Sequence, residues 1–436
     1  MAAILLSSLL NASWQRPGEL RFAFAQARAD VEVEMFEDYA PGRRESPSKN
    51  EEGFLAFPVY THVPGVGSTV GVGFLSRRLF QTKANALAAA MVGDTSVIAG
   101  GITDINILAE NLHFNFYGYA TRLPFQLYAR GKASGRDEYS NLFRQEYGLT
   151  AEASLRFFGR RLEFNFMVAP SRLKNVGASA ADGTRFSNYD NNEVPTLGST
   201  LKAVLDLTDD DHDPHNGAKF QLLYHRSDVQ DDFHSRYGSL NAFATGYLPV
   251  FSHGSLAFHF FRSAAIVSDQ NNRTPDELRA GIGFNCADVQ GTDAQAKCNE
   301  AQDRRVAERV AENRYGTSGL LGGPTQLRGY PIGRFRGSQS LMYALELRQN
   351  IGEENVAFDY GFIRGVRSAL QVAPFLELGA VTDPPETIET APLHANAGVG
   401  FRLGFSGTIL RADIGVSSEG PQFTFFLGYP WDISIL

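Results

Sequence analysis

The chain has 436 residues, a formal net charge of −8 and a pI near 5.7, so its composition gives no support for nucleic-acid binding. It contains 33 Phe, 16 Tyr and 43 Gly, which favours a β-rich fold, because aromatic residues favour strands and glycines serve turns. No run of about 18 apolar residues occurs, which excludes a transmembrane helix but not a membrane barrel, whose strands face lipid only at every second residue.

The N-terminal segment has features of an export signal. Residues 2–10 form a short apolar stretch, and Ala25 and Ala27 fit an A-x-A cleavage site. No Lys or Arg precedes the apolar stretch, and the site lies far beyond it. We expect a signal peptide at 1–27, with a misplaced start or an ordinary amphipathic tail as alternatives. Residues 28–52 are expected to form a linker, since this region is charged and contains proline.

Beyond the linker, apolar and polar residues alternate along short segments. In one of them Leu162, Phe164 and Phe166 fall on one face, and Glu163 and Asn165 fall on the other. A period of two with one apolar face indicates strands that are covered on one side only. Sixteen such segments are expected, at residues 54–75, 83–92, 95–106, 111–120, 122–131, 146–157, 161–172, 198–207, 217–226, 236–249, 254–268, 339–350, 368–382, 393–404, 407–417 and 421–431.

The links between these segments distinguish a membrane barrel from a soluble sandwich. Short links are expected at 158–161, 252–254 and 405–407, and they alternate with long links at 132–145, 173–197, 269–338 and 383–392. Outer-membrane barrels have short periplasmic turns and long outer loops. We therefore expect an all-β fold, a transmembrane antiparallel β-barrel of about 16 strands over residues 53–436, with apolar faces toward lipid and polar faces toward a hydrated lumen.

The longest link has a composition of its own. Residues 293–314 are rich in Ala, Glu, Gln and Arg, which predicts a helix or helical hairpin outside the barrel, with a solvated helix of no dedicated role as the simplest interpretation. Cys286 and Cys298 lie in the same link and are compatible with a disulfide or with two free thiols; an oxidising compartment would favour the disulfide. No His or third Cys lies near enough to complete a metal site.

Five separated motifs occur in order along residues 53–431. They are "FPVYTHVPGVGSTVGVGF" near the start, "DLTDDDHDPHNG" (206–217), "LGGPTQLRGY" (321–330), "FLELG" (375–379) and "GPQFTFFLGYPW" (420–431). Together they resemble the BamA/TamA family of outer-membrane assembly barrels, also called the bacterial surface antigen family. Family members carry periplasmic POTRA domains before the barrel, and we expect the residues ahead of the first strand to be too few to hold one. The resemblance is therefore to the short, barrel-only members.

The resemblance implies that the sixth outer loop folds back into the barrel and that its Arg contacts the inner wall. The wall motif is Phe375, Glu377 and Gly379, with Glu where the family more often has Asp. The period of two independently turns Glu377 toward the lumen. We predict an Arg328–Glu377 ion pair that anchors the loop, with bidentate geometry as one option and an exposed Arg as the alternative. The anchor residues are Gly322, Gly323, Leu327, Arg328, Gly329 and Tyr330, of which Gly329 permits close approach and Tyr330 could stack on the wall.

Family members close the barrel between the first and last strands. Gly428 and Pro430, beside Trp431, disfavour continuous pairing there, so this seam could part and offer unpaired edges to a client strand. The alternative is that they simply end the last strand. The tail "DISIL" after Trp431 departs from the family ending, which is an aromatic residue.

The acidic motif at 206–217 could suggest a metal site. Its spacing does not match an EF-hand loop, and Pro214 followed by Gly217 is typical of a turn, so we expect a structural turn and no metal. The turn residues are Asp206, Asp209, Pro214 and Gly217. No G-x-S-x-G, H-E-x-x-H or P-loop motif occurs, so we expect no enzyme, with a hidden site among the nine His as the alternative.

These observations favour an integral barrel of a Gram-negative-type outer membrane that assists the insertion or transport of proteins or lipids. The alternative is a passive channel or a structural surface antigen. The expected partners are outer-membrane lipid and lipopolysaccharide, with client outer-membrane proteins or a secretion partner; no nucleic acid and no cofactor are expected.

Overall fold

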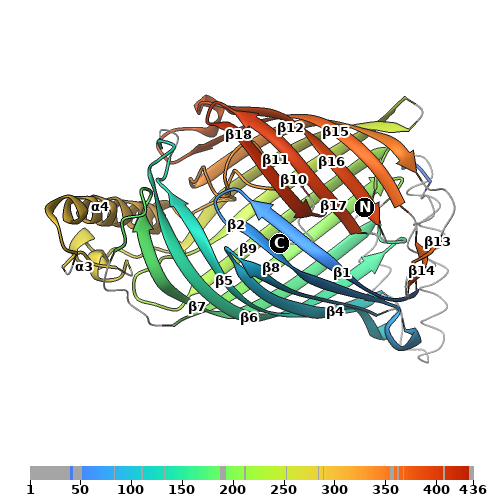
Figure 1. The fold of residues 1–436 in the computed structure, drawn as a ribbon, viewed down its shortest axis with the longest axis horizontal. Coiled ribbons are helices and arrows are strands. Elements are labelled where there is room, and N and C mark those ends of the chain that lie inside the picture. The colour runs from blue at the N-terminus through green and yellow to red at the C-terminus, as the bar shows by residue number, and fades with distance from the viewer. Residues whose placement is uncertain are drawn as a thin grey trace, which may run out of the picture.

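Sixteen of the eighteen strands in the described residues form a closed antiparallel barrel, shown in the computed structural model of Figure 1. The structure describes residues 40–42, 52–82, 84–109, 111–131, 134–186, 193–210, 213–251, 253–282, 284–287, 289–353, 358–360, 363–366, 368–405 and 408–431. The predicted signal peptide at 1–27, nearly all of the linker at 28–52 and the tail after Trp431 lie outside these residues.

The barrel strands follow one another around the wall in chain order. The first eight are β1 (Glu52–Val63), β2 (Gly67–Arg77), β3 (Asn85–Gly93), β4 (Ser96–Ala109), β5 (Leu112–Tyr128), β6 (Tyr139–Phe157), β7 (Leu162–Ala180) and β8 (Val194–Thr208). The second eight are β9 (Gly217–Val229), β10 (Arg236–Val250), β11 (Gly254–Asp269), β12 (Gln339–Glu353), β15 (Ser368–Thr382), β16 (His394–Phe405), β17 (Thr408–Ser417) and β18 (Gly420–Leu427). A short hairpin, β13 (Phe358–Tyr360) and β14 (Ile363–Val366), lies in the link between β12 and β15.

The alternating pattern sorts side chains to the two faces of the wall as predicted. On β7, Phe164 and Phe166 are 46% and 50% exposed on the outer face, whereas Asn165 between them is buried at 6%. Asn165 donates to Glu163 and to Glu152 of the neighbouring β6 inside the barrel. Apolar groups therefore cover the outer face, and polar groups pair within the lumen, which is the arrangement of a membrane barrel.

Two predicted strand assignments were wrong. One expected strand is two strands and two expected strands are one, so the total remains sixteen. Residues 54–75 form two strands, β1 and β2, because the chain turns at Gly65 and Gly67, whose φ values of 88° and 111° suit glycine. Residues 111–131 were expected to hold two strands but form only β5. Thr121, at the expected break, continues the ladder opposite Glu146 of β6.

The two ends of the barrel differ in their links. One end carries the links 158–161, 251–253 and 406–407, and the other carries 181–193, 270–338 and 383–393. We call the second the loop end and the first the turn end. The long links predicted at 132–145 and 173–197 are shorter than expected, because β6, β7 and β8 extend further toward the loop end.

The longest link folds into a helical projection at the loop end. It contains α3 (Pro275–Ala280) and α4 (Thr292–Tyr315), which lie beyond that end of the barrel, while β13 and β14 lie at the other end (Figure 1). The predicted helix is present as α4, and Cys286 and Cys298 form a disulfide with a Cα–Cα distance of 5.7 Å. The interpretation of α4 as a simply solvated helix was incomplete, since Cys298, Ala301 and Val306 pack against Ala178 and Phe186 from the end of β7 and the loop that follows it.

Candidate functional site

Loop six, the link 270–338, returns into the barrel after α4 and places Arg328 against the inner wall. The predicted ion pair is present: Arg328 Nε lies 2.8 Å from Glu377 Oε1, and both side chains are fully buried. The backbone N–H of Arg328 donates to Glu377 Oε2 at 2.7 Å. Asn396 of β16 donates to the same oxygen at 3.0 Å, so both carboxylate oxygens are occupied.

The contact differs from a bidentate fork, because the guanidinium group divides its donors between two carboxylates. Nη1 of Arg328 lies 2.9 Å from Glu346 Oε2 on β12, while Nε serves Glu377. The guanidinium carbon also lies 3.5 Å from the ring centre of Phe375, the first residue of the predicted wall motif. Arg328 therefore joins β12 and β15 through charge and packs on β15 through a cation–π contact.

The ion pair belongs to a larger group that we call the lumen cluster. It contains four guanidinium groups and three carboxylates, and each of these side chains is 0–1% exposed. Its members are Arg328, Arg348, Arg402, Arg411, Glu346, Glu377 and Asp413. Glu346 lies at its centre, within 2.9 Å of both Arg328 and Arg348 and 2.5 Å from Arg402.

Sequence reasoning missed five members of the lumen cluster. The signal was present in the same alternation, since the segments around Glu346 and Asp413 turn these residues away from their apolar faces. What the alternation does not contain is the stagger between strands, which sets Glu346 opposite Phe375 and Ala344 opposite Glu377.

The predicted glycines allow loop six to approach the wall. A Cβ on Gly329 would lie 2.5 Å from Cβ of Asn396, so only glycine fits there. Gly322 and Gly323 have φ values of 103° and 109°. Tyr330 packs edge-on against Phe335 of the same loop, and its hydroxyl donates to the carbonyl of Ala395 at 3.2 Å. The ring also lies edge-on to His394 of β16 with centroids 6.3 Å apart, so Tyr330 meets the wall through this ring contact and through its hydroxyl.

Of the residues predicted at the seam, Trp431 lies inside the barrel. β18 ends at Leu427, and the chain turns inward at Gly428, which has a φ of 84°. The ring of Trp431 stacks on His259 of β11 with centroids 4.7 Å apart, and Trp431 is 5% exposed. Gly428 still donates its backbone N–H to the carbonyl of Ile409 on β17, so the last strand ends there, as in the alternative interpretation, and Trp431 packs in the lumen. Within the described residues, none of the three pairs with β1.

The acidic turn between β8 and β9 is held by its own side chains. Asp209 Oδ1 accepts from the backbone N–H groups of His215 and Asn216, and Asp206 Oδ1 accepts from the backbone N–H of Thr208. A Cβ on Gly217 would lie 2.1 Å from a backbone oxygen. These contacts agree with a structural turn. Within the described residues, no group of three or more His, Cys, Asp or Glu is placed to hold a metal ion.

The seam between β1 and β18 has little backbone pairing. Within the described residues, His62 and Phe425 form its one register pair, whereas β1 pairs with β2 from Gly53 to Val63. At the turn end, Glu52 and Gly53 pair instead with β14. Between residues 55 and 60, β1 has no register partner on its seam side among the residues the structure describes.

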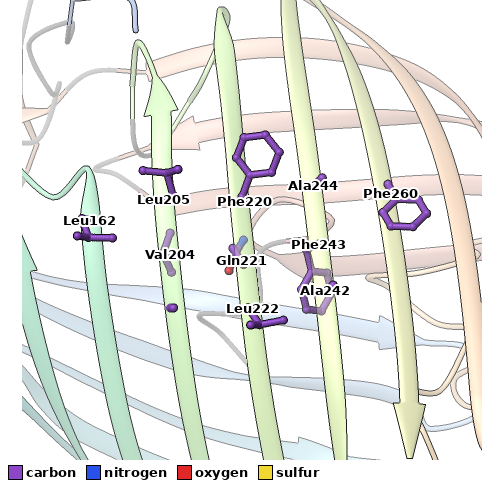
Figure 2. Close-up of a pocket in the computed structure, with 11 residues that line it drawn as sticks. Leu162, Val204, Leu205, Phe220, Gln221, Leu222, Ala242, Phe243, Ala244 and Phe260 are labelled. Atoms are coloured by element: carbon purple, nitrogen blue, oxygen red, sulfur yellow. The ribbon is translucent and has the colours of Figure 1, made fainter. Parts of the chain in front are cut away.

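A shallow apolar hollow of about 370 Å³ lies on the outer face of the wall, across β7 to β11. Figure 2 shows Phe220 and Leu222 of β9 and Phe260 of β11 at this hollow, with Ala242 and Ala244 of β10 between them. Phe220 and Leu222 are 46% and 51% exposed, so the hollow opens outward and not into the lumen. Its apolar lining offers no groups for acid–base or nucleophilic chemistry. In the described part of the chain, no helix is both long and apolar enough to cross a membrane.

No family model matches the chain, and no curated protein matches it in sequence. Among solved structures, CdiB from Escherichia coli superposes with a TM-score of 0.50 at 8% identity, over 89% of this chain and 66% of that one. BamA from Haemophilus ducreyi lacking POTRA domains 1–3 gives 0.49 at 9% identity, over 93% and 78%. CdiB from Acinetobacter baumannii gives 0.47 at 10% identity, over 87% and 60%. At these identities the similarity is one of fold, a 16-stranded barrel like those of outer-membrane proteins.

Proposed function

We propose that the chain is an integral outer-membrane barrel that assists the insertion or transport of proteins or lipids into or across that membrane. The observation that supports this most is the seam, where a closed 16-stranded barrel depends on a single β1–β18 register pair within the described residues. The proposal includes no catalytic step. Its orientation places the loop end outside, facing lipopolysaccharide, and the turn end in the periplasm.

The weakly paired seam is the surface at which the proposed mechanism engages client strands and lipid. Residues 55–60 of β1 present backbone C=O groups, and N–H groups except at Pro58, that β18 leaves without register partners. Such an edge is a template for strand addition, in which main-chain hydrogen bonds supply affinity without demanding one sequence. A client strand could pair there as the seam parts, and a lipid could pass along the same opening.

The lumen cluster supports this proposal by keeping the rest of the wall together. Its ion pairs join loop six to β12 and β15, and Glu346 also contacts Arg402 of β16. These strands lie on the β18 side of the seam, so the barrel could part at β1–β18 while this side stays rigid. The same buried side chains fill the lumen at that level, which disfavours a wide passive channel.

Reconstitution tests the proposal directly. We expect vesicles containing the protein to fold an added, urea-unfolded outer-membrane barrel several-fold faster than protein-free vesicles, measured by the heat-modifiable shift of the client on gels. A dithionite assay with fluorescent phospholipid tests lipid movement in the same vesicles. If neither rate rises, and single-channel recordings show steady conductance, the passive channel replaces this proposal. If neither rate rises and no conductance is seen, a structural surface antigen replaces it.

A further inference from the structure

We propose that Ile332 and Arg334 of loop six clasp the loop-end termini of the two seam strands, so that Arg334 determines whether the seam is closed. We call Ile332 and Arg334, with their partners Pro64 and Glu419, the loop-end clasp. The clasp deepens the proposed function and rests on it only for its effect on clients, since its geometry stands independently.

The first half of the clasp holds β1. The backbone N–H of Ile332 donates to the carbonyl of Pro64 at 2.9 Å, in the turn that connects β1 to β2. The turn and the loop are in close contact there, because a Cβ on Gly65 would lie 3.3 Å from Cβ of Pro331 and 3.5 Å from Cγ2 of Ile332. Gly65 has a φ of 88°, a backbone conformation that favours glycine.

The second half holds β18. Arg334 Nη2 and Nε donate to Glu419 Oε1 at 2.7 and 2.9 Å, and Glu419 lies in the turn that connects β17 to β18. The remaining donors of Arg334 go to Ser134 between β5 and β6, to its hydroxyl and its carbonyl, both at 2.7 Å. The side chain of Arg334 is 2% exposed, so its charge is compensated mainly by one carboxylate.

The two halves are only two residues apart in loop six, and they reach opposite sides of the seam. Between those sides, the backbone ladder contributes one register pair in the described residues, His62 with Phe425. At the loop end, the Arg334–Glu419 ion pair and the Ile332–Pro64 hydrogen bond thus provide much of the stabilisation that a continuous β1–β18 ladder would provide. Arg328 fixes loop six to the inner wall through Glu346 and Glu377. If β1 moved away from β18, loop six could not move with it, and one of the clasp contacts would break.

The test uses the full-length protein in vesicles with spin labels at Val70→Cys and Val416→Cys. Both residues face outward, on β2 and β17, the strands next to the seam strands. The native cysteines are bonded to each other, so only the engineered thiols react. We expect Arg334→Gln to raise the population of a longer inter-label distance by roughly tenfold or more, since a buried charge pair is broken. Glu419→Gln should do the same while leaving the Ser134 contacts in place, which makes it the second variant if Arg334→Gln fails to fold.

The matched control is Arg130→Gln. Arg130 is also buried at the loop end and pairs with Asp383 at 2.7 Å. It also donates to Gly316 and Thr317 of loop six, but it touches neither seam strand, so it tests whether any loss of a loop-six contact opens the seam. Its variant should retain the parental distance. The clasp is overturned if Arg334→Gln and Glu419→Gln both keep the parental distribution, or if Arg130→Gln changes it equally. A clasp variant that opens the seam while the parent shows no client or lipid activity supports the clasp and contradicts the proposed function.

Discussion

Replacing Glu346 by Gln should destabilise the barrel more than any other single substitution in the lumen cluster. Glu346 contacts Arg328, Arg348 and Arg402 at 2.5–2.9 Å, and all four side chains are at most 1% exposed. The substitution keeps the shape of the side chain but removes its charge. Four buried guanidinium groups would then face the two carboxylates of Glu377 and Asp413.

The size of the expected loss of stability follows from the burial of these charged groups. Two unit charges 4 Å apart interact by about 4 kcal/mol at an effective dielectric constant of about 20, and much of this offsets desolvation. Removing one partner of a buried pair costs about 3–5 kcal/mol because it leaves an uncompensated charge. With three arginines affected, we expect the upper end, about 5 kcal/mol, which would lower a urea midpoint by roughly 1–2 M or more.

The assay is urea unfolding of the reconstituted barrel in a Trp14→Phe background, followed by fluorescence of Trp431, which lies 5.8 Å from the Arg348 guanidinium. The control is Glu193→Gln, whose partner Arg172 is 3.3 Å away in a pair that is 60% and 41% exposed; its midpoint should match the parent. If Glu346→Gln unfolds at the parental midpoint, the lumen cluster does not hold the wall together, and the reasoning from buried charge is refuted.

Three further predictions concern loop six and its neighbours. Arg328→Lys keeps the charge but can no longer reach both Glu377 and Glu346 in the observed geometry, so unfolding should require about 2 kcal/mol less, read in the same urea assay; an unchanged midpoint would show that a point charge suffices. Reducing the Cys286–Cys298 disulfide should expose the start of α4 to proteolysis, with about 3 kcal/mol of local stability lost, while the barrel midpoint stays unchanged because both cysteines lie in the helical projection; a shifted barrel midpoint would contradict this. Burial lowers the pKa of His234, in the loop between β9 and β10, so the folded loop resists its protonation. The loop is therefore most stable above the unfolded-state pKa of roughly 6.5, and its free energy of unfolding falls as the pH drops below that value. Hydrogen exchange of residues 230–235 should report this fall, and His234→Gln should abolish it.

The side of the wall on which each residue lies could be predicted from the sequence, because a strand has a period of two. That rule placed Glu377 in the lumen, and the structure pairs it with Arg328. It also turned Glu346 inward, but its three arginine partners come from loop six, from β12 itself and from β16. Bringing them together depends on the stagger between strands, which one sequence does not contain.

The misplaced features have local causes. Strands β1 and β2 were joined because valines and aromatic residues continue on both sides of Gly65, which hid the turn. Trp431 was assigned to the seam because residues 420–431 resemble the family's closing strand. The inward turn depends on the positive φ of Gly428 and on the ring of His259 from a distant strand, and alternation carries no signal for either.

The measurement that tests the seam most directly is a reversible lock. His62→Cys and Phe425→Cys, the register pair between β1 and β18, would be oxidised in a background in which Cys286 and Cys298 are replaced by Ser. Val399→Cys with Ile414→Cys places the same lock between β16 and β17, away from the seam. We predict that the seam lock abolishes client folding and lipid movement, that reduction restores them, and that the second lock changes neither. Full activity with the seam locked would contradict the account.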